Sequence, residues 1–156
     1  MRRFSQKSLP DWVPPTNGHR ADGYTQITAA NETTITALEV ELNLKGEDDY
    51  LKVFKYYSEM REITTVMWLV ADNKIMDKLK QFMKIRRVPN PDAHVFVMLD
   101  DYMVNHWRAK TNSDLKTPTT VRNYYETTLG TTPITTAELQ LNYSAHMTYF
   151  RPAKKY

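Results

Sequence analysis

Three acidic side chains on two neighbouring extended segments are the residues best suited to chemistry in this chain. Glu39 and Glu41 lie two apart in a segment, 33–42, that alternates and is rich in β-branched residues. Residues two apart on a strand project to the same face, about 6.5 Å apart, so the two carboxylates repel each other unless positive charge lies nearby. Asp22, in the preceding extended segment, can supply a third oxygen. The set therefore predicts a site for a divalent cation.

The chemistry of these oxygens favours Mg²⁺ or Mn²⁺, because both ions accept all-oxygen sites that retain water ligands. Lys45 follows the strand, where it can neutralise a phosphate or polarise an attacking water. The alternative is that Glu39 and Glu41 are solvated side chains on an exposed edge strand, which is the commoner situation for such a pair. The amphipathic helix and apolar strand predicted after them favour an interior strand, which makes the two interpretations nearly even.

The elements that must hold these residues indicate an α/β fold with a mixed sheet flanked by helices. The helices are predicted from apolar residues at helical spacing, and the strands from alternation or from short apolar runs. In chain order, the expected elements are strands at 19–27 and 33–42, a helix at 47–60, a strand at 64–70, a helix at 74–86, a strand at 94–99 and a third helix at 101–110.

The two ends of the chain differ from this central part. Residues 1–18 read as an irregular, proline-punctuated lead-in in which Trp12 and Val13 are the plausible anchors. Residues 111–136 are rich in threonine and read as mostly irregular extended chain. Strict alternation over 139–149 predicts a strand that adds to an edge of the sheet or pairs with a second copy in a homodimer. The expected division is 1–18, 19–110 and 111–156.

Composition narrows the classes of protein that need to be considered. The 156 residues suit one compact domain, and the absence of cysteine excludes disulfides, thiolate zinc sites and cysteine nucleophiles. No apolar run approaches the roughly 20 residues that span a bilayer, and no secretory signal is present, so we expect a cytoplasmic protein with no membrane partner. The net charge of +3 is compatible with nucleic acid but does not argue for it alone.

The histidines and basic residues give weaker signals. The four histidines lack the close spacing of a three-histidine metal site, although His19 lies near Asp22 and can assist the acid residues. One side of the predicted helix at 74–86 and its end carry Lys80, Lys84 and Arg87, which can contact a DNA backbone. A solvated helix face is the commoner explanation for such residues.

Several short motifs, taken in order, resemble the replication-relaxation family. They are His19-Arg20-Ala21-Asp22-Gly23-Tyr24, the run from Ala37 to Lys45, Tyr50, the pair Tyr56-Tyr57, and the strand Val66 to Asp72. The resemblance covers about residues 20–107. That family is similar to MOBC-type conjugative relaxases, which implies a restriction-endonuclease-like domain of the PD-(D/E)xK class at 19–110 with an extra C-terminal strand.

The resemblance also implies roles for individual residues. Asp22 matches the acid of an Arg-Pro-Asp-Gly signature in which Ala21 here replaces proline. Glu39 matches the acidic member of (D/E)xK, and Glu41 stands where the archetypal nuclease has lysine. Either Lys45 takes that lysine's role, or the site is catalytically silent. The family's core normally begins before this point, so an upstream part such as a winged-helix domain is expected to be missing.

Two functions follow from these expectations, with a third that rests on the C-terminal strand alone. The first is a metal-dependent endonuclease or relaxase that nicks plasmid DNA at a transfer origin, with Asp22, Glu39, Glu41 and Lys45 as catalytic residues. The second is an inactive DNA-binding accessory protein of replication or mobilisation, working with other mobilisation proteins or a coupling protein. The third is a structural dimer. In the DNA-binding cases, the expected backbone contacts are Arg20, Lys45, Lys80, Lys84 and Arg87.

Overall fold

A mixed seven-stranded sheet forms the centre of the molecule in the computed structural model, which describes residues 11–14, 18–29, 32–112, 119–128 and 147–150. The strands are β1 (Gly23–Ala29), β2 (Glu32–Glu41), β3 (Thr65–Val70), β4 (His94–Met98), β5 (Lys110–Thr111), β6 (Thr119–Thr120) and β7 (Met147–Phe150). The helices are α1 (Glu47–Glu59), α2 (Asn73–Ile85), η1 (Pro91–Ala93), α3 (Leu99–Asn105), η2 (His106–Arg108) and α4 (Val121–Thr128). The strand order across the sheet is β6-β5-β4-β3-β2-β1-β7.

The two strands predicted at 19–27 and 33–42 are present as an antiparallel pair, and β2 lies in the interior of the sheet. Strands β1 and β2 are antiparallel, with Gly23 opposite Leu38. Strands β2, β3 and β4 run parallel and are connected through α1 and α2. Because β2 lies between β1 and β3, the alternative in which its glutamates sit on an exposed edge strand does not hold.

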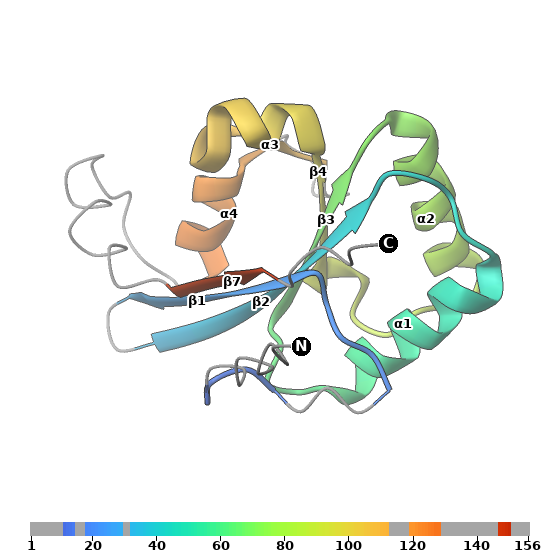
Figure 1. The fold of residues 1–156 in the computed structure, drawn as a ribbon, viewed down its shortest axis with the longest axis horizontal. Coiled ribbons are helices and arrows are strands. Elements are labelled where there is room, and N and C mark those ends of the chain that lie inside the picture. Colours follow the sequence, from blue (N-terminus) through green and yellow to red (C-terminus); the bar gives the residue numbers. More distant parts are fainter. Residues whose placement is uncertain (1–10, 15–17, 30–31, 113–118, 129–146, 151–156) are drawn as a thin grey trace, which may run out of the picture.

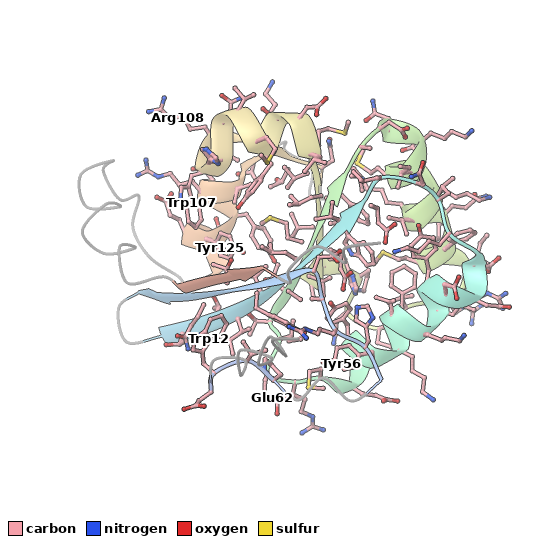
Figure 2. The ribbon with its side chains drawn as sticks, in the orientation of Figure 1. Trp12, Tyr56, Glu62, Trp107, Arg108 and Tyr125 are labelled. Carbon is pink, nitrogen blue, oxygen red and sulfur yellow. The ribbon has the colours of Figure 1, made fainter. Side chains whose placement is uncertain are left out.

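Helices cover both faces of the sheet, so the fold has three layers (Figure 1). Helices α1 and α2 enclose one apolar cluster around Trp68 and Leu79. On the other face, α4 and its neighbours enclose a second cluster that contains Leu38 and Tyr125. Figure 2 shows Trp107 and Tyr125 together on this second face, with ring centroids 5.6 Å apart. The α/β class and the mixed sheet flanked by helices are thus confirmed.

Local sequence signals explain where the two crossover helices begin. In α1, three acidic residues occupy the first turn, where they interact favourably with the helix dipole. In α2, the Oδ1 atom of Asp72 accepts a hydrogen bond from the backbone N–H of Ile75 at 2.8 Å. A side-chain cap of this kind stabilises a helix by about 1 kcal/mol. Asp72 therefore marks the point where β3 turns back into α2.

Residues 121–128 form a helix where the sequence predicts irregular extended chain. Val121, Tyr124 and Tyr125 are buried at helical spacing against the second cluster. The hydroxyl of Thr120 accepts a hydrogen bond from the backbone N–H of Asn123 at 3.2 Å, and Arg122 pairs with Glu126 one turn later. The threonine-rich surroundings hide this short pattern, which is why composition alone favours extended chain.

The helix after β4 is shorter than the predicted range of 101–110. Helix α3 ends at Asn105, because His106 adopts a left-handed φ of 46° and the chain continues as the 3₁₀ turn η2. Residues 147–150 form β7, which pairs antiparallel with β1 at an edge of the sheet, as expected for a C-terminal strand. The rest of the predicted strand, 139–146, lies outside the described residues, as do 1–10 and 15–17 of the lead-in.

Two further features of the described residues bear on the expectations from sequence. Trp12 and Val13 pack against the first apolar cluster, so these two residues are the anchors that the sequence predicts. Within the described ranges, no helix combines the length and the apolar character needed to cross a membrane.

Candidate functional site

Glu39 and Glu41 are buried on the face of β2 that α1 and α2 cover. Their residues are 4% and 2% exposed, and their partners on β3 are Trp68 and Val70. Both partners belong to the apolar cluster on this face. Burying an ionised carboxylate in such surroundings costs several kcal/mol unless hydrogen-bond donors or positive charge compensate it. The groups around each glutamate therefore decide what the pair can do.

Asp22 lies beside the same part of β2. Pairing between β1 and β2 ends at Gly23 and Leu38, so the residues of β2 beyond Leu38 have no backbone partner on β1. The Oδ2 atom of Asp22 accepts a hydrogen bond from the backbone N–H of Val40 at 2.9 Å. Val40 stands between the two glutamates, and Asp22 therefore sits next to both and continues the hydrogen bonding of the hairpin.

Glu39 receives two side-chain hydrogen bonds. The Nε2 atom of His19 lies 2.6 Å from Oε1 of Glu39, and the hydroxyl of Tyr57 donates to the same oxygen. The His19 ring packs edge-on against the rings of Tyr56 and Tyr57, with centroids 5.4 and 5.5 Å away. Figure 2 shows Tyr56 on α1 where this helix faces the N-terminal segment. Glu39 is thus held between the lead-in to β1 and helix α1.

The tyrosines near this carboxylate are poorly suited to act as nucleophiles. Burial, with the negative charge of Glu39 as a second cause, raises the pKa of Tyr57 far above its usual value. Burial likewise raises the pKa of Tyr24, and it raises the pKa of Tyr56 to about 12. Tyr24 is the tyrosine nearest the acid motif, yet it is 0% exposed and its hydroxyl accepts a bond from the backbone of Ala21. None of these three hydroxyls is primed to attack a phosphodiester.

Glu41 has its own set of partners. Its Oε1 atom lies 2.6 Å from Nζ of Lys45, and its Oε2 atom accepts a hydrogen bond from the Tyr50 hydroxyl at 3.2 Å. Burial raises the pKa of Glu41 even though Lys45 acts to lower it. Burial acts to lower the pKa of Lys45, but the hydrogen bond and the charge of Glu41 outweigh it and raise that pKa. The ammonium group therefore stays charged and neutralises the buried carboxylate.

These contacts argue against the three-carboxylate metal site predicted from the spacing. Across the described ranges, no three His, Cys, Asp or Glu side chains are placed to hold a metal ion together. His19 and Tyr57 occupy one oxygen of Glu39, and Lys45 and Tyr50 occupy both oxygens of Glu41. A metal ligand must offer a free lone pair of a deprotonated oxygen. The Mg²⁺ or Mn²⁺ site at Asp22, Glu39 and Glu41 therefore stays a prediction, and these contacts do not favour it.

The basic residues expected to contact DNA fall into two sets. Lys45 belongs to the acid cluster, where it is committed to Glu41, and Arg20 lies near Tyr24, where its charge acts to lower the pKa of the tyrosine. Lys80, Lys84 and Arg87 instead line a cavity beside α2 and β4. The two sets are thus positioned by different elements: Arg20 precedes β1 and Lys45 follows β2, whereas the other three residues lie on α2 or just after it.

Sequence reasoning missed the tyrosine donors of the two glutamates. Tyr50 and Tyr57 were noted in the sequence only as parts of short motifs, and the structure buries both of them on α1. A usable signal was present, because the two tyrosines lie seven residues apart on one helix face while Glu39 and Glu41 share one strand face. An interior acid pair requires donors, and these hydroxyls lie on the helix that follows the strand.

Comparison of the chain with family models, with curated protein sequences and with solved structures gives no match.

Proposed function

We propose that the chain is a nucleic-acid-binding accessory module of plasmid replication or mobilisation, with a restriction-endonuclease-like core and a silent acid cluster. The order of hairpin, crossover helix and parallel strand is the arrangement expected for such a core. Asp22 precedes β1 and Glu39 lies near the end of β2, which supports a match to the two acids of the pattern, while Glu41 stands at the position of its lysine.

The observation that carries the proposal is that the chain's own groups engage both buried glutamates. Lys45 lies 2.6 Å from Glu41, and His19 lies 2.6 Å from Glu39. Cleavage of a phosphodiester through a metal requires these oxygens to exchange their partners for the ion. Losing a partner leaves a buried carboxylate uncompensated, which costs several kcal/mol. The arrangement favours a structural network that joins β1, β2 and α1 over a metal-dependent nuclease.

Helix α2 and the residue pair after it supply the surface for nucleic acid. Residues 73–87 contain six basic residues and one acidic residue, although the whole chain has a net charge of only +3. Most of these cations are exposed; Arg86 is engaged with Glu47 at 2.7 Å. A stripe of exposed cations on one helix binds phosphates through counterion release and carries little sequence information.

The first test is binding of duplex DNA, followed by fluorescence anisotropy over a range of salt concentrations. Lys78→Ala and Lys84→Ala should weaken binding and each reduce the salt slope by about 1. Lys55→Ala, an exposed lysine on α1, is the matched control and should leave both quantities unchanged. No binding by the wild type, or equal losses in all three variants, would overturn the proposal.

The second test separates this proposal from the metal-dependent nickase. Supercoiled plasmid carrying a transfer origin is incubated with Mg²⁺ or Mn²⁺ and either the wild type or Glu39→Gln. We expect no open circles from either protein. Open circles from the wild type that disappear in Glu39→Gln would establish a carboxylate-dependent nuclease and would remove the accessory module as the explanation.

A further inference from the structure

A cavity of about 520 Å³ lies between α2, the turn that follows it, η1 and β4. This volume falls in the range of small-molecule sites, about 300–1,000 Å³. Its apolar lining includes Met83, Val88 and Phe96, and its basic lining is Lys80, Lys84 and Arg87. The acid cluster on the hairpin contributes no residue to it. The cavity is therefore a separate feature from the site described above.

His94 is the buried polar group of this lining, and its protonation state is fixed by a neighbour. The Nε1–H of Trp68 donates to Nδ1 of His94 at 3.0 Å. Because an indole nitrogen can only donate, Nδ1 is the acceptor and Nε2 carries the ring hydrogen. His94 is 5% exposed, and burial lowers its pKa to about 4, so the ring is neutral near pH 7. Within the described part of the chain, Nε2 has no hydrogen-bond partner. His94 therefore offers the cavity one N–H donor.

The basic residues of the lining come from one stripe of α2 and from the turn after it. Lys80 lies with Nζ 5.6 Å from the Phe96 ring centroid, so the stem of this lysine covers the apolar floor. Among the described residues, Lys84 and Arg87 form no ion pair. Asp77 and Asp92 also line the cavity, which leaves an excess of one positive charge. An excess of one positive charge suits a single phosphate group better than the several negative charges of a polyphosphate chain.

The backbone at Arg87 is a further specific feature of this wall. Arg87 adopts φ 50°, and Val88 N–H bonds to the Met83 carbonyl at 3.0 Å, which closes the end of α2 in a Schellman motif. Glycine is the usual residue at this position because a side chain there costs about 1 kcal/mol. The chain instead places an arginine at the mouth of the cavity.

We propose that this cavity binds the phosphate monoester of a small organic molecule, of which a mononucleotide is the simplest case. Lys84, Arg87 and the Nε2–H of His94 are the donors for the phosphate oxygens, and Met83, Val88 and Phe96 contact the organic part. A dianion with several acceptor oxygens uses more of these donors than a carboxylate does, because arginine and lysine bonds to phosphate are charge-assisted. Binding here does not require that the surface of α2 bind duplex DNA.

Calorimetric titration with adenosine 5′-monophosphate, with adenosine as the control, tests the proposal. The wild type should bind the nucleotide and bind adenosine at least about tenfold more weakly, as expected for loss of charge-assisted bonds. Lys84→Ala and Arg87→Gly should each lose about tenfold in affinity. Lys74→Ala, on the same helix and outside the lining, should lose nothing. Equal affinity for the two ligands, or equal loss in Lys74→Ala, would overturn the proposal.

The role of His94 has its own readout, because substitutions at a buried residue can unfold the chain. In long-range ¹H–¹⁵N spectra, the nucleotide should shift the Nε2 resonance of His94 while Nδ1 keeps the shift of an acceptor. His94→Gln keeps an acceptor for Trp68 and a donor for the cavity, so it should retain most of the affinity. An unshifted Nε2 resonance at saturating nucleotide would exclude His94 from the site.

Two further experiments are needed. The first distinguishes the possible sources of the phosphate, and the second tests the cavity and the accessory module independently of each other. Competition by a 5′-phosphorylated single strand, but not by its 5′-hydroxyl form, would identify a DNA end as the source; competition by neither would leave the free nucleotide. Both results support a monoester site. Duplex binding that survives in a chain with no nucleotide affinity would overturn the cavity alone, and the reverse pattern would overturn the accessory module alone.

Discussion

Trp68 and His94 join neighbouring parallel strands through a hydrogen bond from Nε1–H to Nδ1 of 3.0 Å, with the two rings stacked at 21°. The bond requires a neutral histidine, because a protonated ring has no acceptor nitrogen. The contact therefore couples the interior of the sheet to proton concentration, although no exposed group is involved. It also fixes which nitrogen of His94 remains available to the cavity.

Acidification should destabilise the fold through His94. Burial lowers the pKa of His94 from 6.5 to about 4. Because the pKa of His94 is lower in the folded state than in the unfolded state, the neutral ring contributes its full stabilisation of the fold above pH 6.5. This contribution is lost as the pH falls toward 4. The free energy of unfolding should fall by about 2 kcal/mol between pH 7 and pH 4.5. Urea unfolding of the wild type and His94→Gln at both pH values measures it, and a pH dependence identical in the two proteins would contradict it.

Tyr57→Phe should destabilise the protein because it removes a donor from the buried oxygen of Glu39. Leaving a buried acceptor less well satisfied costs about 1–3 kcal/mol. Tyr102→Phe is the matched control, since Tyr102 is a partly buried tyrosine whose hydroxyl has no hydrogen bond within the described residues. Urea unfolding should show a loss for Tyr57→Phe alone, and equal losses would mean that the hydroxyl bond to Glu39 contributes nothing specific.

Lys45→Met should destabilise the protein at neutral pH, because Glu41 would keep only the Tyr50 hydroxyl. We expect a loss of about 1–2 kcal/mol, reduced from a fully buried pair because the Lys45 side chain is 55% exposed. Without Lys45, the raised pKa of Glu41 rises further, so the stability difference should shrink as pH falls and the carboxyl becomes protonated. The double variant Lys45→Met, Glu41→Gln should recover most of the loss, and failure to recover would show that Lys45 acts elsewhere.

Divalent ions should not stabilise the acid cluster. A ligand that binds only the folded state raises Tm with its concentration, and Asp22, Glu39 and Glu41 are already engaged by groups of the chain. We expect the same Tm with Mn²⁺, Mg²⁺ or a chelator. Asp22→Asn keeps an acceptor for Val40 N–H and should retain stability, whereas Asp22→Ala should lose about 1 kcal/mol. A Tm increase with Mn²⁺ that disappears in Asp22→Asn would restore the metal site.

Arg87→Gly should make the protein more stable while weakening nucleotide binding. Relief of the left-handed backbone at φ 50° should contribute about 0.5–1 kcal/mol. Arg86→Gly, one residue earlier with φ −87°, is the control and should destabilise. Chemical unfolding measures both variants. A less stable Arg87→Gly would mean that the side chain contributes to the fold as well as to the cavity.

The sequence predicts the central part of this fold well because the spacing of the apolar residues and the residue composition favour the same elements there. The alternation over 33–42 assigned Ala37 and Leu38 to opposite faces, and the two belong to the two separate clusters. The continuous apolar run at 64–70 predicted an interior strand, and β3 is buried throughout. Helix α4 was not predicted, because only three apolar positions indicate a helix there and the threonines around it favour extended chain.

The sequence predicts which acidic residues form the candidate site, but it does not predict all the groups that compensate their charges. Spacing along β2 identifies Glu39 and Glu41 as a pair that needs compensation, and Lys45 follows from its nearness in sequence. The direction from which His19 and Tyr57 approach depends on how the lead-in and α1 pack on the sheet, which no local pattern encodes. The donor role of His94 depends in the same way on its register with Trp68 across two strands.

Strand β7 gives the fold a particular order of assembly. Gly23, at the start of β1, pairs with Phe150, whereas β1 pairs with β2, which begins three residues after β1 ends, and β2, β3 and β4 follow one another along the chain. Contacts between distant residues form late because closing a long loop costs entropy before the contact stabilises anything. During synthesis, the edge of β1 that pairs with β7 stays open until residues 147–150 emerge, and an open edge is a template for pairing with other chains. The nascent protein is therefore exposed to aggregation through this edge until β7 is added.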